Sequence, residues 1–77
     1  MIEENIIKII EEISGLDAKE IKSSELVDSG ILDSFSLLVL ISEIEKKLNI
    51  TLNNENFDIS DFNNLSSILN YIDKNKK

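Results

Sequence analysis

The sequence predicts a small all-α protein, a bundle of three to four helices with one long loop between the first two main helices. The 77 residues include no proline and only two glycines, a composition that favours helices over a strand-rich sandwich. Apolar residues recur at three- and four-residue intervals in three separate stretches. A chain of this length buries only about 60% of its unfolded surface. We therefore expect residues 1–77 to form a single domain with one small core and no deep catalytic cleft.

The first predicted helix covers about residues 2–14. Isoleucines recur along one side of it, at Ile2, Ile6, Ile9, Ile10 and Ile13. Glu3 and Glu4 complement the positive end of the helix dipole, and Gly15 lies just past the last turn, where helices commonly stop.

Residues 15–33 show no sustained period and are predicted to form a long loop. Isolated apolar residues would pin this loop to the core, namely Leu16, Ile21, Leu26, Val27, Ile31 and Leu32. Because a connection of this length is unusual in a compact domain, we expect it to be functional.

The second main helix is predicted over about residues 34–48. With each residue placed 100° on from the last, one buried stripe forms from Leu37, Leu40, Ile41, Ile44 and Leu48. Phe35 and Val39 fall on the opposite side, with Ser42 close to them and Leu38 on the flank. Apolar side chains are therefore expected to face outward near Ser34.

The remaining chain is predicted to hold a short helical turn and a closing helix. The turn covers about residues 55–60. The apolar residues of this stretch would equally fit an irregular segment that packs over the core. The last helix covers about residues 64–73, with Asn63 or Asn64 as its N-cap. Its apolar residues are Leu65, Ile68, Leu69 and Ile72.

The composition excludes several kinds of function. Without cysteine or histidine the chain has no thiolate nucleophile, no sulfur metal ligand and no imidazole base. A formal charge of −7 argues against nucleic acids and anionic membranes and suits partners with basic patches. The first five residues carry acids where a secretory signal carries lysine or arginine, and no apolar run approaches the roughly 18 to 20 residues of a membrane span. We expect a soluble, cytoplasmic protein without direct membrane insertion.

Asp33 and Ser34, at the start of the second main helix, allow two interpretations. In the first, Asp33 is only an N-cap whose carboxylate accepts the N–H groups of Phe35 or Ser36. In the second, the free N–H groups and the positive dipole also favour a phosphate attached to Oγ of Ser34. Gly30 in the preceding loop and the outward apolar residue directly after the serine favour the second interpretation. The two interpretations are compatible with each other.

An Asp-Ser followed by a large apolar residue, here Asp33-Ser34-Phe35, is the hallmark of a known family. Residues 26–32 fit the same family's Leu-x-x-x-Gly-(Ile/Leu)-(Ile/Leu) approach to that serine. Over essentially its whole length the sequence resembles the phosphopantetheine-binding carrier proteins. These are the acyl carrier proteins, the free-standing peptidyl carriers and the D-alanyl carrier of teichoic-acid synthesis, and the resemblance implies an acyl-carrier-protein-like bundle.

The resemblance implies that Ser34 receives 4′-phosphopantetheine as a phosphodiester from a phosphopantetheinyl transferase. The thiol of that arm then holds an acyl or aminoacyl group as a thioester, so a chain without cysteine gains thiol chemistry. The protein itself is then a non-catalytic, monomeric carrier that serves a loading ligase and a downstream acyltransferase or synthase. Asp33 caps the helix and helps to position Ser34 for the transferase. The expected partner contacts are Phe35, Leu38, Ser42, Asp28 and Glu43.

The sequence departs from the fatty-acid carriers at positions that bear on which group the arm carries. Ser36 stands where many of these have an acid, and Lys46 and Lys47 make this face less acidic. A specialised pathway is therefore favoured, whether secondary-metabolite, peptidyl or D-alanyl, with fatty-acid synthesis as the alternative within the class. The alternative outside the class is an unmodified helical interaction domain. A hydrolase using Ser34 is disfavoured because no histidine can act as its base.

Overall fold

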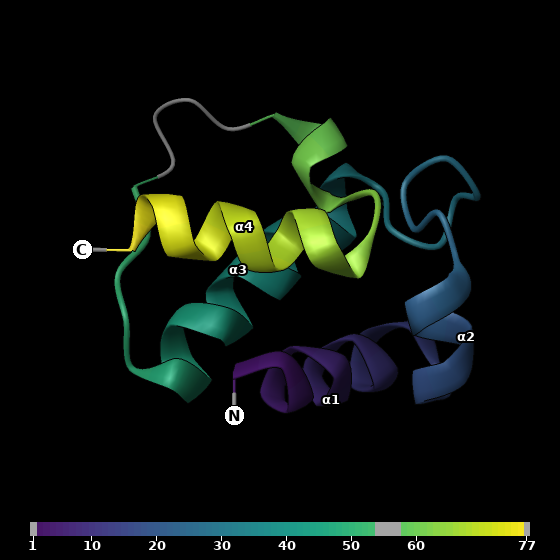
Figure 1. Cartoon of the computed structure of the whole chain (residues 1–77), viewed down its shortest axis with the longest axis horizontal. Helices are drawn as coiled ribbons and strands as arrows, with labels where there is room; N and C mark the ends of the chain where they lie inside the picture. Colours follow the sequence, from purple (N-terminus) through teal and green to yellow (C-terminus); the bar gives the residue numbers. More distant parts are fainter. Residues whose placement is uncertain (1, 54–57, 77) are drawn as a thin grey trace.

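A computed structural model of the chain, described over residues 2–53 and 58–76, confirms the all-α fold class (Figure 1). It contains the helices α1 (Ile2–Ser14), α2 (Ala18–Ser23), α3 (Ser34–Leu48) and α4 (Leu65–Asn75), together with a short 3-10 helix, η1 (Ile59–Phe62). No helix in the described part of the chain is long and apolar enough to cross a membrane.

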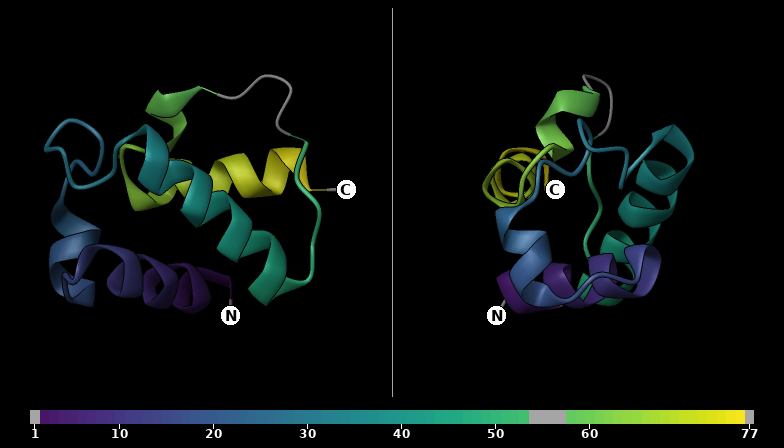
Figure 2. Two further views of the ribbon diagram at one scale, coloured as in Figure 1. Left: turned by 180° about the vertical axis from the view of Figure 1, so that it is seen from behind. Right: turned by 90° about the vertical axis from the view of Figure 1, so that its right-hand side faces the viewer.

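Three long helices surround one core. α1 packs mainly against α3 and also contacts α2 and α4, while η1 packs on α4 and α3. α3 runs obliquely across the molecule and packs on α1 (Figure 2). The fully buried side chains with the largest volumes are Phe62, Ile6, Ile9, Ile10, Ile21, Leu26, Leu32, Leu37, Leu40, Ile44, Ile68 and Ile72. No polar or charged residue of the described ranges is buried, so the interior is held by apolar packing alone.

The apolar stripes lie where helical periodicity places them. α1 buries Ile6, Ile9 and Ile10 and also Ile7, which widens the predicted stripe, whereas Ile2 at the start of the helix is 45% exposed. The buried side chains of α3 are Leu37, Leu40, Ile41 and Ile44, and Leu48 is partly buried against the same cluster. α3 ends where Asn49 adopts φ 54°, a left-handed conformation that stops helices.

The prediction of a continuous loop over residues 15–33 is wrong, because this segment contains α2. Asp17 caps α2 by accepting the backbone N–H of Glu20 at 2.9 Å. The helix has only six residues and buries only Ile21 fully, with Ala18 partly packed on the core. Such a short element cannot display the repeated apolar spacing by which helices are recognised in a sequence.

Two further boundaries differ from the sequence prediction. The turn expected over residues 55–60 is η1, which begins at Ile59 after the N-cap Asp58; residues 55–57 of that prediction lie outside the described part of the chain. The last helix, expected over 64–73, runs from Leu65 to Asn75 with Asn64 as its N-cap. It continues through Lys74 because the backbone N–H of Lys76 still reaches the carbonyl of Ile72, at 2.9 Å.

Candidate functional site

Ser34 is the first residue of α3, and its side chain is exposed. Asp33 precedes it in an extended conformation and caps the helix, because its Oδ1 accepts the backbone N–H of Ser36 at 2.9 Å. Hydrogen bonds from the backbone N–H and the hydroxyl of Ser36 lower the pKa of Asp33. The cap keeps the first turn of α3 in place. The hydroxyl of Ser34 is thus presented outward at the positive end of a 15-residue helix.

The loop before Ser34 is closed by its own backbone and anchored by two buried leucines. The N–H of Leu32 donates to the carbonyl of Leu26 at 2.8 Å, and both side chains lie in the core. Within this closed segment the N–H of Gly30 donates to the carbonyl of Val27 at 3.0 Å. Gly30 has a φ of +83°, a conformation that other residues adopt only with strain. This turn therefore explains the glycine four residues before the serine.

Asn63, between η1 and α4, fastens this loop to the rest of the protein. Its carbonyl oxygen Oδ1 accepts the backbone N–H groups of Val27 at 3.0 Å and Asp28 at 2.9 Å. Its Nδ2 donates to Oδ2 of Asp28 at 3.3 Å, and its backbone carbonyl accepts the N–H of Leu26. One residue thus holds three consecutive loop positions. The sequence indicated Asn63 as a candidate N-cap of the last helix. Its separation of about 35 residues from the loop hides the clamping role from any local pattern.

We expect Asn63→Ala to destabilise the protein by about 1 to 3 kcal/mol, because it leaves two backbone N–H groups and the Asp28 carboxylate without their partner. Chemical denaturation of the variant measures this loss. Asn70→Ala, which removes an exposed amide from α4, is the matched control and should change the free energy of unfolding by less than about 0.5 kcal/mol. Equal effects of the two substitutions would contradict the clamping role.

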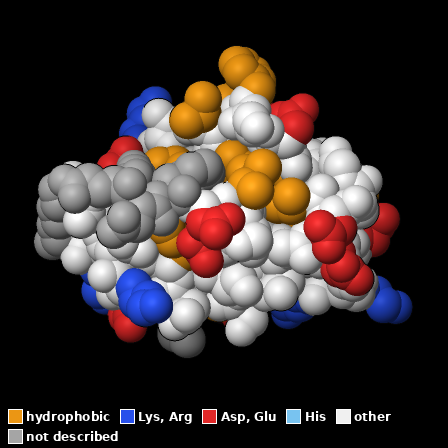
Figure 3. Space-filling view, turned by 90° about the horizontal axis from the view of Figure 1, so that it is seen from above, with side chains coloured by type: hydrophobic (Ala, Val, Ile, Leu, Met, Phe, Trp, Pro, Cys, Tyr) orange, Lys and Arg blue, Asp and Glu red, His pale blue; other side chains and the backbone are white. Residues whose placement is uncertain are grey.

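The expected partner contacts divide between α3 and the loop. Phe35 is 75% exposed and Leu38 64% exposed, so neither belongs to the core. Leu38, Val39, Ser42, Glu43 and Lys46 line a shallow groove of about 390 Å³ on the outer side of α3. Asp28 lies apart from this groove, on the loop held by Asn63. On the face shown in Figure 3, hydrophobic side chains gather in one area and acidic side chains lie around it.

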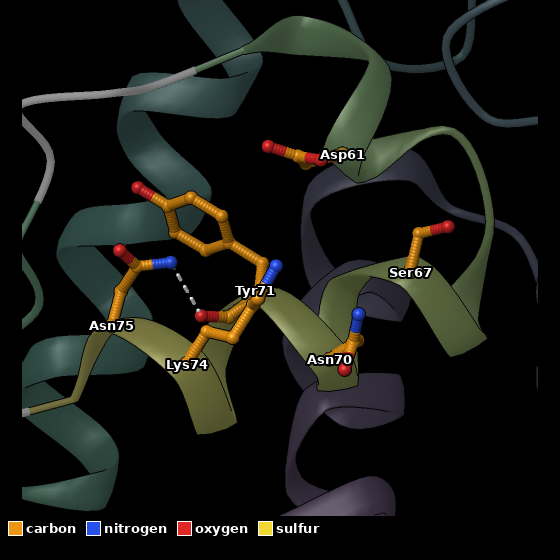
Figure 4. Close-up of a pocket in the computed structure, with 6 residues that line it drawn as sticks. All are labelled: Asp61, Ser67, Asn70, Tyr71, Lys74 and Asn75. Carbon is orange, nitrogen blue, oxygen red and sulfur yellow. Dashed lines mark hydrogen bonds between the residues drawn. The ribbon is translucent and has the colours of Figure 1, made fainter.

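A polar pocket of about 370 Å³ lies between η1 and α4 (Figure 4), and none of the predicted site residues lines it. Its lining residues are Asp61, Ser67, Asn70, Tyr71, Lys74 and Asn75. Burial raises the pKa of Tyr71, and the negative charges of Asp61 and Glu45 raise it further. The amide of Asn75 donates to the backbone carbonyl of Tyr71 at 2.9 Å. Within residues 2–53 and 58–76 no cluster of acidic, histidine or cysteine side chains could hold a metal ion.

A helical bundle that exposes a serine at the capped start of a helix, with exposed apolar side chains beside it, has the features of a carrier domain. The family described as phosphopantetheine attachment site matches residues 4–72. The chain therefore belongs to the phosphopantetheine-binding carrier family, whose members carry 4′-phosphopantetheine covalently. Membership confirms the resemblance indicated by Asp33-Ser34-Phe35 and by residues 26–32.

Relatives from streptococci resemble the chain along most of its length. A D-alanyl carrier protein of Streptococcus suis is 37% identical over 68 residues, which cover 88% of this chain and 86% of the relative. A D-alanyl carrier protein of Streptococcus pyogenes is 30% identical over 73 residues, covering 95% and 92%. One of Streptococcus mutans is 32% identical over 68 residues, covering 88% and 86%.

Proposed function

We propose that Ser34 is the attachment point of 4′-phosphopantetheine and that the arm carries a D-alanyl group as a thioester. The observation that carries the proposal is the exposed Ser34 hydroxyl at the capped start of α3, in a chain of the phosphopantetheine-binding family. A phosphodiester there would lie at the positive end of the helix, where negative charge is stabilised. The D-alanyl cargo is inferred from the names of the three relatives.

The protein on this proposal is a substrate of enzymes and performs no catalysis itself. The thiol of the bound arm supplies the nucleophile that the chain, without cysteine, lacks. A loading ligase would join D-alanine to ATP as an acyl adenylate with release of pyrophosphate. It would then transfer the alanyl group to this thiol with release of AMP, and an acyltransferase would remove the alanyl group from the arm. Because the loading step consumes ATP, we place the protein in the cytoplasm, where it works as a monomer.

The surface beside Ser34 is proposed to receive these enzymes in turn. Phe35 and Leu38 present large apolar side chains to solvent directly after the attachment point, and Ser42 extends the same side of α3. Exposed aromatic residues are frequent anchors of protein interfaces. Asp28 and Glu43 would add negative charge at the edges of this contact.

The proposal is tested by modification followed by loading. The purified chain is incubated with coenzyme A and a broad-specificity phosphopantetheinyl transferase, and the intact protein is weighed. We expect the mass of one phosphopantetheinyl group to be added. The modified protein is then given ATP and a D-alanine-adenylating ligase, and a hydroxylamine-labile alanyl group should appear.

Two results would contradict parts of the proposal separately. A chain that gains no mass is not a carrier and would be an unmodified helical domain. A modified chain that is loaded by an enzyme activating fatty acids, but not by the D-alanine ligase, is a carrier with a different cargo.

A further inference from the structure

The loop that leads to Ser34 is held by one residue from a distant segment. Asn63 lies at the end of η1, directly before the N-cap of α4. Its backbone carbonyl accepts the N–H of Leu26 at 2.6 Å, and its Oδ1 accepts the N–H groups of Val27 and Asp28 at 3.0 and 2.9 Å. Three successive backbone donors of the loop therefore bond to a single residue.

A further backbone bond links these loop positions to the start of α3. The N–H of Leu32 donates to the carbonyl of Leu26 at 2.8 Å, so the residue held by Asn63 in turn holds Leu32. Only Asp33 separates Leu32 from Ser34. A displacement of the loop at Leu26 would therefore be passed on to the first turn of α3 and to the hydroxyl that it presents.

Core packing holds the ends of this loop but not its middle. Leu26 and Leu32 are fully buried, whereas residues 28–30 between them are exposed. The middle of the loop is therefore kept in place mainly by hydrogen bonds, and segments with few buried apolar contacts open locally at low free-energy cost. Removal of the Asn63 side chain would let this segment change conformation while the helices stay packed.

We propose that Asn63 is a positioning residue for the modification of Ser34, because it holds the loop in the conformation that the phosphopantetheinyl transferase binds. This rests on the proposed carrier function. An enzyme that reaches Ser34 also meets the exposed residues 28–30 just before it. A surface that is ordered before binding loses less conformational entropy in the complex. Asn63 thus acts through the loop and not on the reacting hydroxyl.

The reaction itself is carried out by the transferase. Oγ of Ser34 forms a bond to the phosphorus that bears the pantetheine of coenzyme A. The bond between the two phosphates breaks, the adenosine bisphosphate half of coenzyme A leaves, and the proton of the hydroxyl is released. None of these atoms belongs to Asn63, so its loss should weaken recognition of the carrier and leave the chemical step unchanged.

The test measures transferase kinetics with coenzyme A at a temperature at which denaturation curves show every variant to be folded. Asn63→Ala should raise KM for the carrier about fivefold or more, with kcat within about twofold, because only molecules with the loop in the binding conformation are competent. Ile10→Val, which trims a fully buried side chain of α1, is the control for lost stability. It removes no bond to the loop and should leave KM within about twofold.

Hydrogen exchange of the unmodified proteins, measured by NMR without the transferase, reports on the loop itself. The N–H groups of Gly30 and Leu32 bond to carbonyls that Asn63→Ala leaves in place. They should nevertheless exchange at least about tenfold faster in this variant, because the loop opens locally. In Ile10→Val their exchange should stay within about threefold of the parent.

Other outcomes identify which inference has failed. If the parent protein gains no phosphopantetheine, the proposed function fails, and the positioning role fails with it. If the parent is modified and Asn63→Ala has the same KM, only the positioning role is overturned. A raised KM with unchanged exchange at Gly30 and Leu32 would also overturn it, because Asn63 would then contact the transferase directly.

Discussion

Replacing Ser34 with alanine is expected to abolish attachment of phosphopantetheine completely. The phosphodiester forms on a hydroxyl oxygen, and alanine offers none at the start of α3. Because Ser34 is exposed and its substitution leaves the Asp33 cap to Ser36 in place, the variant should fold as the parent does. Intact mass after treatment with coenzyme A and the transferase measures the result, and circular dichroism verifies the fold.

Ser36→Ala provides the matched control for this prediction. Ser36 lies two residues further along the same helix turn, and its backbone N–H, which bonds to Asp33, survives the substitution. This variant should accept one phosphopantetheinyl group as the parent does. Modification of Ser34→Ala, or loss of modification in Ser36→Ala, would move the attachment point away from Ser34.

The sequence predicted the capped start of α3 because its determinants are local. An N-cap aspartate, the serine after it and the outward Phe35 lie within three consecutive residues. The 100° spacing of α3 places Phe35 opposite the buried stripe and Leu38 on its flank, and the structure exposes both side chains. The buried stripe of α3 follows from the same spacing. Local chemistry and periodicity therefore suffice to identify both the helix and the residue that it presents.

The features that the sequence did not reveal depend on contacts between distant segments. Asn63 holds the loop before Ser34 through bonds that span about 35 residues, and Glu12 pairs with Lys47 across a similar separation. A groove beside Phe35 exists only because α1 packs on α3. α2 was missed for a different reason, since six residues with one buried isoleucine give no period to detect.

We expect Phe62→Ala to destabilise the protein more than Asn63→Ala, Ser34→Ala or Phe35→Ala does. Phe62 is fully buried at the end of η1, and its ring centroid lies 4.9 Å from that of Tyr71 on α4. Truncation of a buried phenylalanine to alanine typically lowers the free energy of unfolding by about 3 to 5 kcal/mol. A domain of 77 residues has a total stability of only about 4 to 12 kcal/mol, so a large part of it would be lost. Urea denaturation followed by circular dichroism measures the change.

Phe35→Ala makes the same chemical change at a surface position and separates folding from recognition. Phe35 is 75% exposed, so its removal should change the free energy of unfolding by less than about 0.5 kcal/mol. Loading by the D-alanine ligase should nevertheless slow, because the aromatic side chain next to Ser34 is lost from the proposed contact. Phe62→Ala should show the opposite behaviour, with normal loading of whatever fraction remains folded. If both variants lost stability equally, Phe35 would belong to the core and could not be an anchor for partner enzymes.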